Sequence, residues 1–211
     1  MRRAPLTLLP LVALISACGQ GGDTRQNESS TQNGPASGSA TIAKTYEGPK
    51  PEGVSSPNDV FTRTYYIPAA ASSDMYEIEA GKLALKRGTR PEVKAFAQQM
   101  IEDHGKTTKA LSAFVASHPV NVAIPSHMDA RHQAMMENLE NSTAKEFDKV
   151  YIGQQAAAHQ EALNLHKSYA SNGDDKALSA VAKSTAGVVE HHAAAVHKLE
   201  QTLGAGHSTA G

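Results

Sequence analysis

The sequence has few of the features that mark several large protein classes. Its 211 residues include one cysteine, no tryptophan, 4 Phe and 6 Tyr. A total of 20 Lys and Arg against 21 Asp and Glu gives a formal net charge of −1, which provides no basic footprint for nucleic acid. Beyond Ile15 there is no run of about 20 apolar residues, the length that a membrane-spanning helix needs. The composition therefore argues against a polytopic membrane protein and a nucleic-acid partner, and leaves room for one domain with a sizeable tail.

The N-terminal residues have the pattern of an export signal. Arg2 and Arg3 precede a short apolar segment that closes on small residues. The stretch from Ile15 to Cys18 resembles the lipobox of bacterial lipoproteins, in which the cysteine is acylated and becomes the new N-terminus. This resemblance implies a signal peptide over residues 1–17 and a lipid on Cys18, and two or more acyl chains anchor a protein stably to a membrane. Gly19, rather than an Asp, after the cysteine favours the outer membrane of the cell envelope, with the protein facing the periplasm.

Two regions of different composition follow the cysteine. Residues 18–57 are rich in Gly, Ser, Thr, Asn, Gln and Pro, and we expect a disordered linker. After them, apolar residues recur at spacings of three and four, which predicts an all-α domain over residues 58–204, followed by a disordered tail over 205–211. Capping residues, glycines and prolines delimit predicted helices at 69–87, 91–117, 125–141, 143–171 and 174–203. The range 69–87 is the firm part of the first helix, because Ser56 or Asn58 can cap an earlier segment that Pro68 either kinks or separates from it. Short connections between long helices predict an up-down four-helix bundle with one extra short helix.

Several acids and imidazoles are predicted to face the interior of this bundle. His104 and His192 fall within the apolar stripes of their helices, and His191 lies on the border of the same stripe as His192. Glu79 lies on the edge of the stripe in the first helix, and we expect Glu77 farther toward solvent. The fourth predicted helix has a polar flank beside its core face. This flank contains Asp148, Gln155, His159 and His166.

Four sequence blocks resemble one known family over about Val60 to Leu203. The blocks are Met75–Leu85, Val93–His104, Glu146–Tyr151 with His159, and Glu190-His191. They are similar to the ferritin-like domain of unknown function found in predicted bacterial outer-membrane and periplasmic proteins. The resemblance implies a ferritin-like bundle and an envelope location, but no established reaction. The positions that it singles out are Glu77 or Glu79, His104, Asp148, Tyr151, His159 and His191.

These observations predict a possible site for one transition metal ion. The expected ligands are Glu79, His104, His159 and His191; the second choices or supporting residues are Glu77, Asp148, Tyr151 and His192. Helical phase alone prefers His192 to His191, whereas the resemblance prefers His191, and we place His191 first. Di-iron bundles carry Glu-x-x-His motifs, but Ile101 and Val188 stand three positions before His104 and His191. A site rich in imidazole therefore favours Zn, Cu or Ni over a di-iron centre.

Three functions remain open at this point. The leading hypothesis is a non-enzymatic, lipid-anchored envelope protein that binds a transition metal in its bundle core. The second is a structural or stress-protective envelope protein whose interior polar groups satisfy one another without a metal. The third is a metal-dependent oxidase or hydrolase, which would need an open coordination position and a substrate cleft. The sequence names no protein partner and no oligomeric state.

Overall fold

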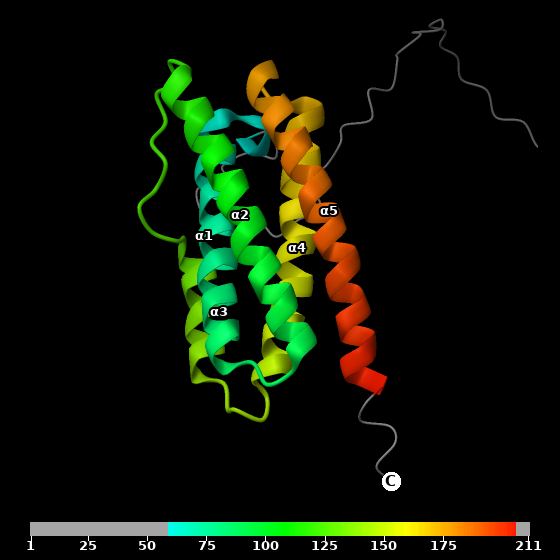
Figure 1. The fold of residues 1–211 in the computed structure, drawn as a ribbon. Helices are drawn as coiled ribbons and strands as arrows, with labels where there is room; N and C mark the ends of the chain where they lie inside the picture. The colour runs from blue at the N-terminus through cyan, green and yellow to red at the C-terminus, as the bar shows by residue number, and fades with distance from the viewer. Residues whose placement is uncertain (1–58, 206–211) are drawn as a thin grey trace, which may run out of the picture. The chain divides into compact units, whose positions relative to one another are not determined.

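The computed structural model describes residues 59–205, whose regular secondary structure is all helical (Figure 1). Its elements are the 3-10 helix η1 (Asp59–Phe61) and the α-helices α1 (Arg63–Arg87), α2 (Pro91–Ser117), α3 (Ala130–Asn141), α4 (Phe147–Asn172) and α5 (Lys176–Ala205). The predicted all-α class is confirmed. The first helix extends beyond its predicted firm part, because α1 begins at Arg63 and continues through Pro68. Two starts were predicted too early: α3 begins at Ala130, where Asp129 accepts a hydrogen bond from the His132 backbone N–H, and α4 begins at Phe147.

The predictions for the N-terminal region lie outside the described residues. They comprise the signal peptide over 1–17, the lipid on Cys18 and the linker over 18–57. Of the predicted tail, only Ala205 is described, as the last residue of α5. Within residues 59–205, no helix combines the length and the apolar character needed to cross a membrane.

The four long helices form a closed ring of neighbours. α1 packs against α2 and α4, and α5 packs against the same two helices. In Figure 1 the chain runs down α1, up α2, down through α3, up α4 and down α5, so that neighbouring long helices are antiparallel. The connection from α2 to α4 is long, because it runs the length of the bundle and includes α3, which packs on α1 and α4.

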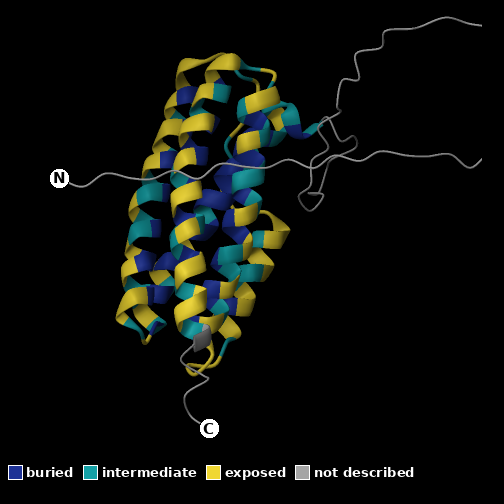
Figure 2. Cartoon of the chain, turned by 90° about the vertical axis from the view of Figure 1, so that its right-hand side faces the viewer, coloured by how far each residue is buried: buried dark blue, intermediate teal, exposed yellow. Residues whose placement is uncertain are grey.

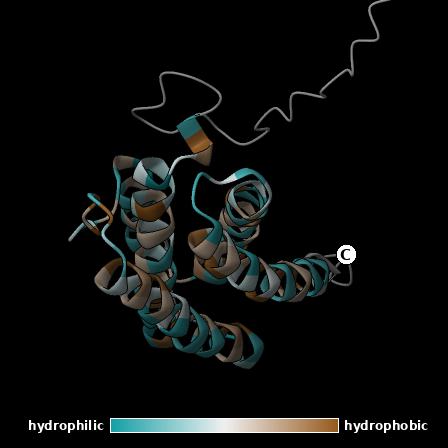
Figure 3. Ribbon diagram, turned by 90° about the horizontal axis from the view of Figure 1, so that it is seen from above, coloured by the Kyte–Doolittle hydropathy of each residue, from teal (hydrophilic) through white to brown (hydrophobic). Residues whose placement is uncertain are grey.

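The apolar core is divided into two clusters, one toward each end of the bundle. The lower cluster, at the lower end in Figure 1, contains Tyr76, Phe96, Met100, Phe147 and Tyr151 among its large members. The upper cluster contains Tyr66, Leu111, Phe114, Tyr169 and Leu178. Figure 2 shows buried residues along the inner sides of the helices, and Figure 3 shows hydrophobic and hydrophilic residues interleaved along them.

Specific contacts fix the lower ends of the helices. Asp148 in α4 accepts hydrogen bonds from the backbone N–H groups of Thr89 and Arg90 and from the Thr89 hydroxyl, and so caps the start of α2. Arg87 donates to the carbonyls of Leu139 and Ser142 at the end of α3. These contacts tie the start of α4 to the start of α2, and the end of α1 to the end of α3.

Gly81 allows α1 to approach α2 closely. A Cβ atom at this position would lie 3.0 Å from the Ala97 carbonyl oxygen and 3.0 Å from Cγ1 of Ile101. The two helices therefore touch through backbone and small groups one turn below the residues described next.

Candidate metal centre

A layer of buried polar side chains separates the two apolar clusters. Every long helix contributes to it, so the layer crosses the whole bundle. We call this set the polar layer; its members are Asp74 and Glu77 of α1, His104 and Thr107 of α2, Gln155, His159 and His166 of α4, and Thr185 and His192 of α5. Burial of so many polar groups is unfavourable unless each finds a partner.

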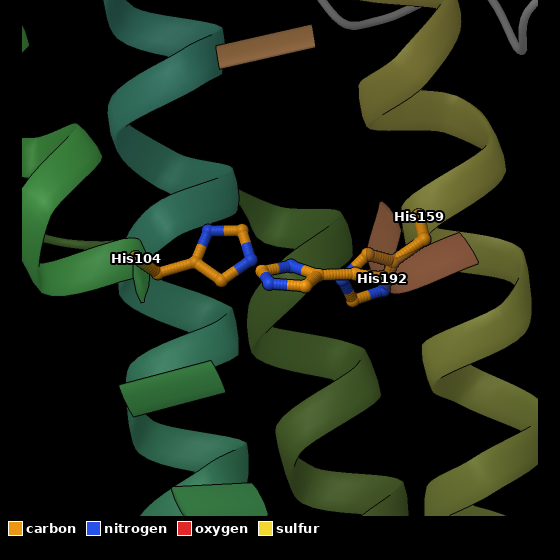
Figure 4. Close-up of side chains that lie close together, drawn as sticks. All are labelled: His104, His159 and His192. Carbon is orange, nitrogen blue, oxygen red and sulfur yellow. The ribbon is translucent and has the colours of Figure 1, made fainter. Parts of the chain in front are cut away.

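Three imidazoles converge at the centre of the polar layer. His104, His159 and His192 come from three different helices, and Figure 4 shows their rings gathered in the space between them. One ring nitrogen of each residue lies within 4.8 Å of the corresponding nitrogens of the other two. The three residues are 1%, 1% and 0% exposed. Their nitrogens therefore form a compact donor set that solvent does not reach.

Each of the three rings is held in place through one nitrogen. His104 Nδ1 lies 2.8 Å from Asp74 Oδ1, and His192 Nε2 lies 3.1 Å from Asp103 Oδ2. His159 Nδ1 lies 2.8 Å from the backbone carbonyl oxygen of Gln155. Since all three neighbours are acceptors, these nitrogens carry the ring protons.

The opposite nitrogens have no hydrogen-bond partner within the described part of the chain. They are His104 Nε2, His159 Nε2 and His192 Nδ1, all inaccessible to solvent. Ligating histidines typically donate their other N–H to a carboxylate or a backbone carbonyl, which fixes the tautomer and aims the lone pair at the metal. The three rings have this arrangement.

Of the groups that hold the rings, Asp74 is itself fixed by the most hydrogen bonds. Besides His104, it accepts hydrogen bonds from the hydroxyls of Thr107, at 2.9 Å, and Thr108, at 3.1 Å. The Asp74 side chain is only 5% exposed. A carboxylate fixed by this many donors gives the His104 ring one orientation.

Burial keeps two of the three imidazoles neutral. It lowers the pKa of His159 to about 3, with a further contribution from the nearby His104. It also lowers the pKa of His192 to about 4, although the hydrogen bond to Asp103 opposes the shift. Both rings therefore offer a free lone pair at neutral pH.

His104 and Glu77 respond differently to the same environment. Burial lowers the pKa of His104, but the hydrogen bond to Asp74 and the charges of Glu77 and other carboxylates outweigh it, so that the pKa is raised overall. Burial raises the pKa of Glu77 to about 7. Glu77 is 1% exposed; its Oε1 lies 3.8 Å from His159 Nδ1, and its Oε2 has no partner among the described residues. A cation in the layer would compete with the proton on each of these two groups.

The structure separates two of the four expected ligands from the cluster. Glu79 is exposed and forms an ion pair with Lys82 at 2.7 Å, whereas Glu77, expected nearer to solvent, is buried in the polar layer. His191 is exposed, and His192, the second choice, belongs to the cluster. The reason in α1 is that α3 covers its outer side, so residues on nearly all sides of that helix are buried around position 74.

The other two supporting candidates belong to the lower part of the bundle. Asp148 caps α2, and its hydrogen bonds go to Thr89 and Arg90 and not to the three histidines. Tyr151 packs against Phe147 and Phe96, and its buried hydroxyl has no partner among the described residues. Asp148 is thus accounted for by the architecture, whereas Tyr151 leaves one polar atom unexplained.

Sequence reasoning missed Asp74 and did not assign roles to Asp103 or Gln155. A different helical stripe in α1 would have found Asp74, because Ala70, Asp74, Glu77 and Gly81 recur at the spacing of a single face. That face is made of small and acidic residues, so hydrophobicity does not reveal it. The contacts of the Asp103 carboxylate and the Gln155 backbone carbonyl depend on how the helices pack and leave no local pattern.

A second group of polar residues resembles a hydrolytic triad in composition but not in geometry. Ser72 Oγ and Asp129 Oδ2 both lie 2.9 Å from the same nitrogen, Nδ1 of His132. The Ser72 hydroxyl oxygen also accepts the backbone N–H of Asp129. A triad uses the two ring nitrogens for different partners. This group instead anchors the start of α3 on α1.

The three free nitrogens fit a small cation that prefers imidazole. Zn–N bonds of about 2.0–2.1 Å in tetrahedral geometry require nitrogens about 3.3 Å apart, so rings whose nitrogens lie within 4.8 Å of one another would move closer on binding. Imidazole suits Zn, Cu and Ni, while Mg and Ca prefer oxygen ligands. The donor set therefore favours a transition metal over an alkaline-earth ion.

Comparison with known proteins gives one match. The model of the domain of unknown function DUF4142 matches residues 50–199. Searches of curated proteins and of solved structures gave no match. Because the match covers most of the sequence, including the histidine cluster and all four long helices, the chain belongs to the DUF4142 family.

Proposed function

We propose that this protein binds one transition metal ion in its bundle core through His104, His159 and His192. The observation that carries the proposal is that the two nitrogens of each ring have different surroundings. One nitrogen of each ring is fixed by an acceptor, and the other is buried and unpartnered. The three rings also meet closely, because each places one nitrogen within 4.8 Å of a nitrogen of the other two. An unsatisfied buried polar atom costs about 1–3 kcal/mol, so a purely structural role would leave a substantial penalty uncompensated.

Glu77 is the candidate for the fourth ligand. It is the only member of the polar layer that has both a carboxylate and an oxygen without a partner among the described residues. Asp74 is engaged by His104 and two threonines. If the Glu77 side chain turns toward the three histidines on metal binding, its oxygen completes a site with three nitrogens, a donor set that suits Zn or Cu.

A mononuclear centre is more consistent with the residues than a di-iron centre. Ile101 and Val189 stand three positions before His104 and His192, so neither helix has the Glu-x-x-His motif of di-iron bundles. The single long crossover between α2 and α4 is nevertheless the connectivity of ferritin-like bundles, which supports a ferritin-like classification of the fold. We infer a ferritin-like scaffold with a mononuclear site and a non-enzymatic role.

We further propose that the protein is a lipoprotein of the bacterial cell envelope. The support is in the sequence: the short apolar segment after Arg2 and Arg3, and the lipobox-like stretch that ends at Cys18. Gly19 favours the outer membrane, with the domain in the periplasm. Metabolic labelling with a palmitate analogue should mark the wild type and not Cys18→Ser, and labelling of both would refute lipidation at this cysteine.

Calorimetric titration tests the metal site. Metal-stripped protein should bind one equivalent of Zn or Cu, and His192→Ala or the double variant His104→Ala/His159→Ala should lose this binding. His191→Ala is the matched control, because it removes an adjacent but exposed imidazole and should bind like the wild type. Equal losses in the His191 and His192 variants, or binding retained by the double variant, would contradict the site.

A further inference from the structure

Two tyrosines of the upper cluster are stacked face to face beside the polar layer. The ring centroids of Tyr66 and Tyr169 are 4.2 Å apart, with an interplanar angle of 20°. The two residues are 1% and 0% exposed. They lie on α1 and α4, so the stack bridges two helices in the interior.

Each hydroxyl of the stack is hydrogen-bonded to a group that can accept a proton. Tyr66 Oη lies 2.9 Å from Nδ1 of His166, and the Tyr169 hydroxyl donates to Asp174 Oδ1 at 2.7 Å. A phenol is a stronger acid than a neutral imidazole N–H, so the Tyr66 hydroxyl is the donor. Burial lowers the pKa of His166 to about 4, which keeps its ring neutral and able to accept at neutral pH.

The stack connects the interior to the surface. His166 belongs to the polar layer, whereas the Asp174 side chain is 38% exposed at the α4–α5 turn. The order of contacts from inside to outside is His166, Tyr66, Tyr169 and Asp174. Every contact in this order is a short hydrogen bond or a ring stack.

We propose that the Tyr66–Tyr169 stack is a one-electron oxidation site that reduces small oxyl radicals at the protein surface, with His166 and Asp174 as the proton acceptors. This inference stands on contacts separate from those of the proposed metal ligands and does not depend on a bound metal. It adds a redox function that neither the family match nor the three histidines imply.

The chemistry balances in two steps. In the first, an oxyl radical takes one electron from Tyr169, whose phenolic proton moves to Asp174 Oδ1, and the oxidant leaves as its one-electron-reduced anion. In the second, an electron moves from Tyr66 to the Tyr169 radical across the ring stack. The proton on Asp174 returns to Tyr169, and the Tyr66 proton moves to His166 Nδ1. The products are a buried Tyr66 radical, a protonated His166 and restored Tyr169 and Asp174.

Two other buried tyrosines provide internal controls. The Tyr76 hydroxyl donates to Gln154 Oε1, a neutral amide oxygen that is a very weak base. The Tyr151 hydroxyl has no partner among the described residues. Both residues are 0% exposed, so they match the stacked pair in burial and differ in having no proton acceptor.

The experiment uses the full chain, treated with chelator, in a background with Tyr46→Phe and Tyr65→Phe. Photogenerated tris(bipyridine)ruthenium(III) serves as the one-electron oxidant, and rapidly frozen samples are examined for a tyrosyl radical by electron paramagnetic resonance. The background protein and Y76F/Y151F should both give the signal, whereas Y66F/Y169F should lose it. Circular dichroism checks that each variant is folded.

A surface variant provides a second measurement. Asp174→Asn keeps an acceptor oxygen but removes the base, so radical formation should become slower while the fold is retained. The proposal is overturned if the signal persists in Y66F/Y169F, if it disappears in Y76F/Y151F, or if Asp174→Asn leaves the rate unchanged. Because the protein contains no metal in this experiment, its outcome is independent of the proposed metal site.

Discussion

The polar layer and the lower cluster occupy the same bundle a few turns apart and bury their side chains equally well. In the lower cluster, residues such as Phe147 and Met100 pack in the manner of an ordinary helical core. In the polar layer, six buried polar atoms, including one nitrogen of each clustered histidine, have no partner among the described residues, against one in the lower cluster, the Tyr151 hydroxyl. Burial without satisfaction weakens a fold, so the comparison indicates that the two regions serve different purposes.

Truncation in the lower cluster should have the largest effect on stability. Phe147→Ala removes a fully buried ring that contacts Tyr151 and the Arg87 guanidinium, and it should lower the free energy of unfolding by about 3–5 kcal/mol. His159→Leu, a similar change in the polar layer, should leave the metal-free protein as stable as the wild type or more so. Urea unfolding measures both, and a large loss in His159→Leu would remove the distinction between the regions.

Metal addition should stabilise the protein through the polar layer alone. Free Zn at 100 times its dissociation constant adds about 2.7 kcal/mol to the free energy of unfolding. Thermal unfolding with and without Zn should show this gain for the wild type, His191→Ala and Phe147→Ala, but not for His192→Ala. A Zn-dependent shift in His192→Ala would place the ion elsewhere.

Acid should destabilise the metal-free protein because of the same layer. Burial lowers the pKa of His159 to about 3, and those of His166 and His192 to about 4. Between pH 6.5 and these values, the unfolded chain binds protons that the folded protein does not. The free energy of unfolding therefore decreases as the pH is lowered. Two groups oppose this loss because they bind protons more tightly in the folded state: Glu77, whose pKa burial raises to about 7, and His104, whose pKa the hydrogen bond to Asp74 raises. The net loss should be about 2 kcal/mol from pH 6.5 to 5.5, measured by urea unfolding. No loss in this window would contradict the neutral state of these rings.

Two isosteric substitutions should have different effects on the free energy of unfolding, and these changes are the smallest of those predicted. Asp148→Asn weakens the cap of α2, where the carboxylate accepts three hydrogen bonds from Thr89 and Arg90, and should cost about 1 kcal/mol. Glu77→Gln removes a buried charge that lacks a full set of partners, and should leave the metal-free protein unchanged or about 1 kcal/mol more stable at pH 8. Metal affinity should respond in the opposite way, falling in Glu77→Gln and not in Asp148→Asn. A destabilised Glu77→Gln would show that the carboxylate supports the fold.

The sequence predicted the helices better than the site because helix ends are local. Gly88 marks the end of α1 and Pro91 marks the start of α2, and both predicted boundaries agree with the structure. Helical phase placed His104 and His192 inside, and both are buried. The choice of His191, made from family resemblance, placed an exposed residue among the ligands, so here periodicity was the better guide.

The acidic residues could not be assigned in the same way. In α1 the apolar stripe is weak, because small residues such as Ala70 and Gly81 share the buried face with Asp74 and Glu77. The side of this helix that faces inward is decided by α3, α4 and the close contact with α2, all distant in sequence. The contacts that aim the rings are therefore properties of the assembled bundle.

The close approach at Gly81 makes the geometry of the centre depend on a residue that performs no chemistry. Asp74 and Glu77 stand on one side of this contact, and His104 stands on the other. Any larger residue at position 81 would act as a wedge against the Ala97 carbonyl and Ile101, and would spread the two helices that carry the ring and the carboxylate that aims it. Evolutionary constraint on the centre should therefore extend to this glycine, and a Gly81→Val protein would stay helical while losing the alignment of His104.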